Sequence, residues 1–168
     1  LDAISEDDIT KLEENIHNTD VIMEIVSQTY LNSNSYLEDN GQPAIAAMVL
    51  VGGWIEGLYL STQLVSPKDL NNDKLAGRIV DQKLSVDNLI SLLDNNKGNP
   101  AIDDIIVQMN RIKAVFDKIS ITTSDIKPEY SEAEKLTVLR SDVKSNLTVE
   151  VFRELSAVVS EIRNSFVK

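Results

Sequence analysis

The sequence predicts an all-α protein, an antiparallel bundle of about five helices in a single domain over residues 1–168. Apolar residues recur at intervals of three and four along most of the chain, which is the spacing of amphipathic helices. Short polar connections with Asn, Gly or Pro separate these stretches. A chain of 168 residues with 42% apolar and 26% charged residues also has the usual composition of one globular core.

The first two helices are expected to begin at polar caps. Ser5 precedes three acidic residues and can cap a helix with the stripe Ile9, Leu12 and Ile16. Asp20 can cap a second helix. The buried stripe of that helix is expected to contain Val21, Ile22, Ile25, Val26 and Tyr30. The polar stretch 32–42, which contains Asn40-Gly41, is typical of a loop.

The third helix is predicted over residues 43–65, the most apolar stretch of the chain. Pro43 suits the first turn of a helix, where its missing N–H costs nothing. A span of about 20 apolar residues can also cross a bilayer. Glu56 interrupts the apolar run, however, and a mid-span acid costs several kcal/mol in a membrane. We therefore expect the central helix of a soluble bundle and no transmembrane span.

Three more helices are expected further along the chain. One begins at Asn72 or Asp73 and ends near Gly98, where glycine can adopt positive φ. A further helix with a clear apolar stripe is expected to have Asn99 as its cap and Pro100 as its first residue. This stripe contains Ile102, Ile105, Ile106, Met109, Ile112, Phe116 and Ile119. The last helix begins at Thr148. Its apolar stripe contains Val151, Phe152, Leu155, Val158, Val159, Ile162 and Phe166.

The segment 120–146 departs from helical spacing. Residues 119–122 alternate apolar and polar, Pro128 disfavours a helix, and residues 136–139 are rich in residues that favour strands. We expect a small β-hairpin or an extended excursion here, although residues 131–135 could instead form a helical turn.

Charge is distributed unevenly. The net charge is −11, and residues 1–40 contribute −9 of it, since they hold ten acidic residues and only Lys11. Such a surface repels nucleic-acid phosphates and anionic lipids, so nucleic-acid binding is not expected. The helices formed by residues 1–40 are expected to pack on the nearly uncharged centre of the bundle. Their charge would then form an acidic patch on one side of the molecule. The absence of cysteine excludes disulfides, thiol nucleophiles and thiolate metal sites.

The segment Gly52-Gly53-Trp54-Ile55-Glu56-Gly57 is unusual for a helix interior. Each glycine costs about 1 kcal/mol relative to alanine, and close packing of a neighbouring helix is the usual compensation. We therefore expect Gly52, Gly53 and Gly57 to be helix-packing residues. In the alternative interpretation, Trp54, Glu56, Tyr59 and Gln63 line a ligand-binding cleft.

Glu56 is the one acidic residue in this apolar stretch. Burial without a partner would raise its pKa, as in general acids, whereas pairing with Arg78, Lys83 or Arg111 would lower it.

Other candidates for chemistry are weaker. His17, the only histidine, is expected at the solvated break between the first two helices, and a metal site formed with Glu13 or Asp20 is an alternative. Residues 94–99 resemble a calcium loop but lack its glycine and acid spacing, so a helix end is the simpler interpretation. Thr148, in the sequon 146–148, can serve as a helix cap. Phosphate-binding glycine loops, HExxH and GxSxG are missing, and no catalytic residue, cofactor or metal site is predicted.

The stretch Ile45-Ala-Ala-Met-Val-Leu-Val-Gly-Gly-Trp-Ile-Glu-Gly-Leu-Tyr-Leu-Ser-Thr-Gln63, with 13–15 and 32–37 before it, resembles a family of uncharacterised helical exported proteins of Bacteroidota. The resemblance covers mainly residues 6–65. Members of that family look like lipoproteins, which implies a periplasmic or lipid-anchored location and a signal peptide and lipid-attached cysteine upstream. The chain begins at Leu1, so we expect a processed form or fragment of a longer precursor.

Together these features favour a non-enzymatic domain of the cell envelope. It is expected to bind a small ligand or an envelope protein through a cleft near residues 52–63. A structural or protein-interaction scaffold without a ligand pocket is the alternative, and an enzyme that uses Glu56 is a third possibility. The oligomeric state does not follow from the sequence.

Overall fold

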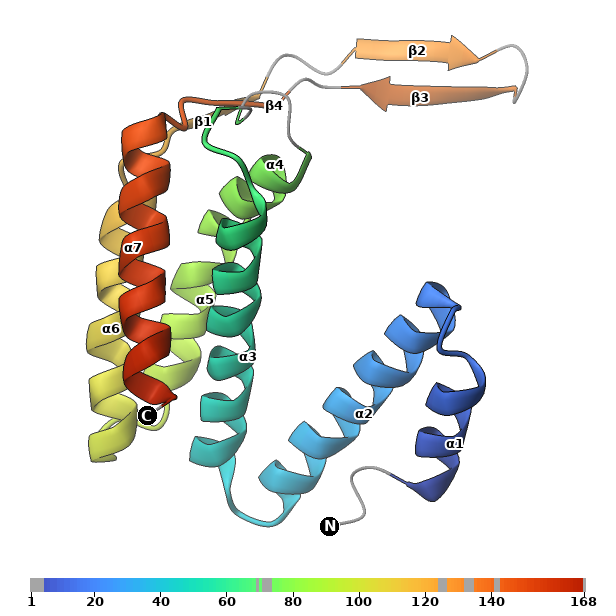
Figure 1. Cartoon of the computed structure of the whole chain (residues 1–168), viewed down its shortest axis with the longest axis vertical. Helices are drawn as coiled ribbons and strands as arrows, with labels where there is room; N and C mark the ends of the chain where they lie inside the picture. The colour runs from blue at the N-terminus through green and yellow to red at the C-terminus, as the bar shows by residue number, and fades with distance from the viewer. Residues whose placement is uncertain are drawn as a thin grey trace.

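The chain forms a helical bundle with two projections, an N-terminal pair of helices and a small β segment (Figure 1). This computed structural model describes residues 5–68, 70, 74–123, 127–131, 135–140 and 143–167. The bundle consists of α3 (Pro43–Leu64), α4 (Lys74–Asp81), α5 (Lys83–Asp94), α6 (Pro100–Phe116) and α7 (Val149–Phe166). The all-α fold class is confirmed.

The core of the bundle lies between α3, α5, α6 and α7. Helix α3 packs against α7, and α5 packs against α6. The largest fully buried side chains come from all four of these helices, from α4 and from the residues after α6. They are Val51, Ile55, Ile79, Val86, Leu93, Ile102, Met109, Ile112, Phe116, Ile119, Leu155 and Ile162.

The two helices with the clearest periodicity behave as predicted. The α6 stripe is buried except for Ile105, which is half-buried, and Asn99 caps the helix through its side-chain oxygen. In α7 the middle of the stripe is buried, whereas Phe166 at the end is exposed. Thr148 caps α7 by accepting a hydrogen bond from the Val151 N–H, as expected for a helix N-terminus.

The helix predicted from residue 72 or 73 to residue 95 is divided in two. Helix α4 ends at Asp81, and the Gln82 N–H bonds to the Ile79 carbonyl three residues back, which tightens the last turn before α5 begins. The predicted start, Asn72 or Asp73, lies outside the described residues. Gly98 has a φ of +93° after the end of α5, so the predicted glycine turn is confirmed.

Helix α3 is, within the described residues, the helix long and apolar enough to cross a membrane by length and composition. It packs against α7, α5 and α4, and its inward side supplies Ala47, Val51, Ile55 and Leu58 to the core. Only 28% of its most apolar window is buried, however. Ala44, Met48, Leu50, Trp54 and Tyr59 are half-buried against the core, whereas Ile45, Val49, Leu60 and Leu64 are exposed.

The N-terminal arm, helices α1 (Glu6–Glu14) and α2 (Thr19–Asp39), leaves the bundle at the turn 40–42 and diverges from α3 (Figure 1). Gly41 has a φ of +69° in this turn, which confirms the predicted Asn40-Gly41 turn. Ser5 caps α1 as predicted and forms a capping box with Asp8.

Three expectations for the arm are corrected. No residue of α1 or α2 is buried, so the expected buried stripe at 21–30 is half-buried or exposed, and the arm does not cover the bundle. Asn18, rather than Asp20, caps α2. The predicted loop 32–42 is helical as far as Asp39. Side-chain hydrogen bonds four residues apart, from Gln28 to Asn32 and from Asn34 to Glu38, support this polar end of α2.

The expected β excursion is confirmed. Strand β1 (Ile121–Thr123) pairs with β4 (Val143–Ser145), and β2 (Lys127–Ser131) pairs with β3 (Leu136–Arg140), both antiparallel. The β2–β3 ladder projects beyond the top of the bundle in Figure 1. The Asn146 side-chain oxygen accepts a hydrogen bond from the Ser120 N–H at 2.7 Å, which ties the two ends of the excursion together.

Candidate functional site

The segment 52–63 lies in the middle of α3 and presents its side chains on three sides. Because successive helical residues are rotated by about 100°, Glu56, Tyr59 and Gln63 share one side, toward α7. Trp54 projects toward α4 and α5, where its indole N–H donates a hydrogen bond to Gln82 Oε1 at 2.9 Å. The four residues predicted to line one cleft therefore fall on two separate sides of the helix.

Glu56 forms a two-pronged ion pair with Arg163 of α7. The Arg163 Nε and Nη2 atoms donate to the two carboxylate oxygens at 2.9 and 3.2 Å. The guanidinium also lies over the Tyr59 ring, 5.1 Å from its centroid. Hydrogen bonding to Arg163 lowers the pKa of Glu56, with a smaller opposing contribution from desolvation. A carboxylate held in its charged form is a poor proton donor near neutral pH.

The partner of Glu56 differs from the three that the sequence suggested. Lys83 donates to the Ile119 carbonyl, Arg111 pairs with Glu161 at 2.8 Å, and Arg78 lies beside Trp54 on the other side of α3. Arg163 is 107 residues away in sequence and follows a buried Ile162 in the last helix. No feature of the sequence links it to Glu56, because only the packing of α7 on α3 brings the two together.

Gln63 makes only long contacts on this same side. Its Nε2 atom lies 3.4 Å from Ser156 Oγ of α7 and 3.4 Å from Thr62 Oγ1. Its side chain is exposed, so it belongs to the seam between α3 and α7 and is free to reorient there.

Trp54 lines a hollow of about 240 Å³ between α3 and α4. Its polar lining comes from the Arg78 guanidinium, the Gln82 amide and the Ser61 hydroxyl, and Gly57 and Ile79 contribute to its walls. Arg78 forms no ion pair with any described residue. An indole beside an unpaired guanidinium can hold a small molecule with an anionic group and a flat apolar body.

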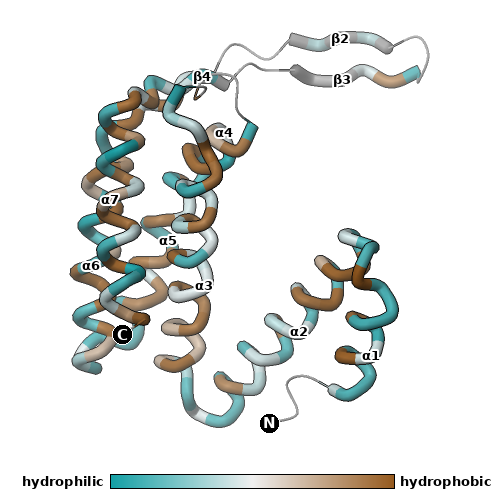
Figure 2. Tube along the Cα trace, in the orientation of Figure 1, coloured by the Kyte–Doolittle hydropathy of each residue, from teal (hydrophilic) through white to brown (hydrophobic). Residues whose placement is uncertain are grey.

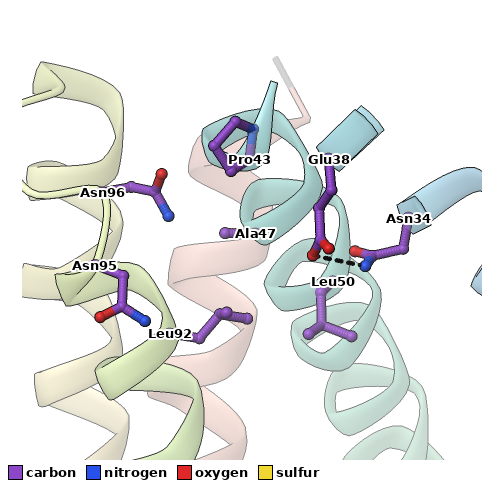
Figure 3. Close-up of a pocket in the computed structure, with 8 residues that line it drawn as sticks. All are labelled: Asn34, Glu38, Pro43, Ala47, Leu50, Leu92, Asn95 and Asn96. Carbon is purple, nitrogen blue, oxygen red and sulfur yellow. Dashed lines mark hydrogen bonds between the residues drawn. The ribbon is translucent and has the colours of Figure 1, made fainter. Parts of the chain in front are cut away.

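A second hollow, of about 330 Å³, lies at the base of the arm (Figure 3). Helix α2 contributes Asn34 and Glu38, which are joined by a 2.9 Å hydrogen bond, and the end of α5 contributes Asn95 and Asn96. Pro43, Ala47, Leu50 and Leu92 complete the lining. The side-chain amides and one carboxylate give it polar character without a cation. It is the junction at which the arm meets the bundle.

Among the described residues, a neighbouring helix approaches Gly53 but not Gly52 or Gly57. A Cβ added to Gly52 or Gly57 would meet no described atom within 4 Å outside the helix itself. At Gly53 it would lie 3.9 Å from the Tyr30 hydroxyl oxygen of α2, an ordinary contact distance. Gly52 and Gly57 instead border two separate hollows, one with Met48 and Phe166 and the other with Trp54 and Arg78.

Helices α3 and α2 each carry an apolar stripe that the described chain leaves partly exposed. On α3, Gly53, Gly57, Leu60 and Leu64 follow one another at helical spacing, and both leucines are exposed. On α2, Met23, Val26, Tyr30 and Leu37 form the matching stripe, in which Met23 and Val26 are exposed. Tyr30 of the α2 stripe approaches Gly53 of the α3 stripe, and toward the N-terminal end of α2 the two helices diverge (Figure 1). Hydrophobic positions along both helices are visible in Figure 2. We call this pair of stripes the open face.

The structure assigns no chemical role to the remaining candidate residues, His17 and 94–99. His17 is exposed between α1 and α2, as predicted. Within the part of the chain that the structure describes, no three His, Asp or Glu side chains gather so that they could hold a metal ion. Residues 94–99 form the end of α5 and the cap of α6, which confirms the simpler interpretation.

Comparison with known proteins identifies no family for this chain. No family model, curated protein or solved structure matches the chain. The function must therefore be argued from the surfaces of the molecule.

Sequence reasoning missed the most unusual of these surfaces. Of the apolar residues of the open face, only Val26 and Tyr30 were expected in a buried stripe, Leu37 fell in an expected loop, and Met23, Leu60 and Leu64 were not singled out. The available signal is that apolar residues occur around most of α3, more than the single apolar stripe of an amphipathic helix.

Proposed function

We propose that the protein is a non-enzymatic interaction module of the cell envelope, which binds a partner protein along the segment 53–64 of α3 and the facing side of α2. The observation that carries this proposal is the open face. Single exposed apolar residues are ordinary, but an exposed apolar stripe that continues along a helix is typical of a binding surface.

The chemistry of Glu56 supports a non-catalytic role. Arg163 neutralises it and keeps its pKa low, and within the described residues no second acid or base is paired with it. The ion pair also links α7 to α3. The envelope location rests on the resemblance of residues 6–65 alone, and a signal peptide followed by cysteine in the precursor would support it.

The proposal is tested by crosslinking the protein in the membrane fraction of its source organism and comparing wild type with a Leu60→Ser, Leu64→Ser variant. We expect a discrete crosslinked partner that the variant loses, while circular dichroism and light scattering of the purified variant stay unchanged. Equal crosslinking of both proteins would contradict the proposal.

A second candidate function is favoured by the hollow at Trp54. A small anionic ligand could bind there between the indole and Arg78. Because Trp54 is the only tryptophan, its fluorescence reports on this site alone. A compound that shifts the emission and raises the melting temperature in wild type, but not in Arg78→Ala, would establish it. Absence of any such compound in a broad anionic library would favour the protein-binding module.

A further inference from the structure

The hollow at the base of the arm has polar groups on two opposite sides and an apolar floor between them (Figure 3). On the α2 side, the Glu38 carboxylate accepts a hydrogen bond from the Asn34 amide at 2.9 Å. On the α5 side, Asn95 and Asn96 follow directly after the end of the helix. The floor consists of Pro43, Ala47, Leu50 and Leu92. The volume of about 330 Å³ is within the range of pockets that hold small molecules.

The charge on the α2 side of the hollow is uncompensated. Glu38 forms no ion pair with any residue that the structure describes. No Lys or Arg occurs between Lys11 and Lys68, so the last turn of α2 also lacks a basic residue beside its C-terminal carbonyl groups. On the α5 side, Lys97 is already paired with Asp94 at 2.8 Å. The hollow therefore favours a cation beside Glu38 and disfavours an anion.

The α5 side of the hollow offers neutral hydrogen-bonding groups. The side-chain amides of Asn95 and Asn96 form no hydrogen bond with another described residue. An amide both donates and accepts, so this side suits a neutral polar group such as a hydroxyl. The apolar floor between the two sides suits a short hydrocarbon chain.

We infer that this hollow binds a short organic amine. The ammonium group lies on Glu38, the hydrocarbon chain lies over the apolar floor, and a hydroxyl or similar polar group at the other end lies on Asn95 and Asn96. The ligand thereby joins the arm to the bundle, because Glu38 belongs to α2 and the two asparagines follow α5. This site goes beyond the proposed function, since none of these residues belongs to the open face.

Three compounds with the same four-carbon chain and terminal hydroxyl test the preference for a cation: aminobutanol, butanediol and hydroxybutyrate. Each is titrated into the isotope-labelled full chain, and the backbone and side-chain amide signals are followed by NMR. Aminobutanol should shift the signals of Asn34, Asn95 and Asn96 saturably, in the millimolar range usual for so small a ligand. Butanediol and hydroxybutyrate should bind at least about tenfold more weakly, because neither supplies a charge-assisted hydrogen bond to Glu38. Equal binding of either compound would overturn the inference.

Matched variants at the end of α2 locate the charge. Glu38→Gln keeps the shape of the side chain and should weaken aminobutanol binding at least about fivefold. Asp39→Asn removes the same charge from an exposed neighbour that does not line the hollow, and it should change binding by less than about twofold. Circular dichroism checks that α2 stays helical in both variants. Equal losses would overturn the inference in favour of unspecific charge attraction.

The double variant Asn95→Ala, Asn96→Ala tests the other side of the hollow. In wild type, aminobutanol should bind more tightly than butylamine, which has the same chain and amine but lacks the hydroxyl. The double variant should bind the two amines equally. A preference for aminobutanol that persists in this variant would overturn the placement of the ligand.

The Leu60→Ser, Leu64→Ser variant separates this inference from the proposed function. It should bind aminobutanol as wild type does, whether or not it loses a crosslinked partner in the membrane fraction. Loss of amine binding in this variant would show that the hollow is not an independent site and would overturn the inference.

Discussion

The bundle and the N-terminal arm consist of similar helices, but they differ in how much of each helix is buried. Helix α2 has 21 residues and α3 has 22, and side-chain caps begin both helices of the arm as well as α6 and α7 of the bundle. Every fully buried large side chain nevertheless belongs to the bundle or to the residues directly after α6. Burying a Leu, Ile or Val side chain contributes about 1.5–3 kcal/mol. The difference shows that helix length and capping define the elements, whereas burial decides which of them share a core.

This comparison implies that the arm contributes little to the cooperative stability of the protein. An isolated helix in water is marginal even when its sequence favours helix, because its nucleation is unfavourable. In the arm, α1 and α2 support each other through few contacts, and α2 meets the bundle near the turn 40–42. A partner on the open face would supply the burial that the chain itself lacks.

The largest expected effect is the difference in free energy of unfolding between two leucine substitutions, one in the bundle and one in the arm. Leu155 of α7 is 0% exposed and Leu31 of α2 is 60% exposed. Leu155→Ala should lower the free energy of unfolding by about 2–5 kcal/mol, through lost burial and the cavity left behind. Leu31→Ala should change it by less than about 0.5 kcal/mol. Urea unfolding measures both values, and the m-value checks that the unfolding transition is the same. A comparable loss at Leu31 would show that the arm belongs to the cooperative core.

A smaller effect is expected from the two helix caps. Thr148 caps α7 and Ser5 caps α1, each by accepting a hydrogen bond from a backbone N–H. Thr148→Ala should destabilise the whole protein by about 1 kcal/mol. Ser5→Ala should leave the unfolding midpoint in place and accelerate hydrogen exchange within α1 alone, because that helix opens locally. Faster exchange throughout the bundle in Ser5→Ala would contradict this division.

The smallest effect concerns two ion pairs. Arg163 lowers the pKa of Glu56, so the pair stabilises the fold above the unfolded pKa of the carboxyl group, and this stabilisation is lost as the pH falls through the lowered pKa of the folded state. Glu56→Gln should therefore lower the melting temperature slightly at pH 7, and the difference from wild type should shrink below pH 4. The control Asp7→Asn removes the exposed Asp7–Lys11 pair of the arm and should leave the bundle's melting temperature unchanged. A difference for Glu56→Gln that stays constant with pH would contradict the pairing.

The parts of the fold that could be read from the sequence are those in which periodicity and burial coincide. The stripe from Ile102 to Ile119 is regular, and its helix lies against α5 and α7, so the pattern and the core agree. For Val26 the same kind of pattern was misread, because periodicity reports that one side of a helix is apolar and says nothing of what covers that side. The polar end of α2 was misread for another reason. Asn and Ser are common in loops, but here pairs of side chains four residues apart bond along the helix.

The candidate site was predictable to a similar extent. The segment 52–63 was recognisable because three glycines and an acid interrupt an apolar helix. The partners of its side chains were not, since Gln82 and Arg163 lie 28 and 107 residues away and reach Trp54 and Glu56 only through the packing of α3. The role of the glycines depends on what lies above them, and among the described residues only the Tyr30 hydroxyl, beside Gly53, comes within 4 Å of a Cβ placed there.

A small change of backbone angle at the Gly41 turn would displace the far end of the arm by a large distance. At 1.5 Å per residue, α2 is roughly 30 Å long, so a rotation of 10° at its base displaces its far end by about 5 Å. A few degrees of backbone torsion in residues 40–42 would therefore change the separation between α3 and the far end of α2 by several ångströms. The spacing of the two stripes is set at this turn, far from the residues that would touch a partner.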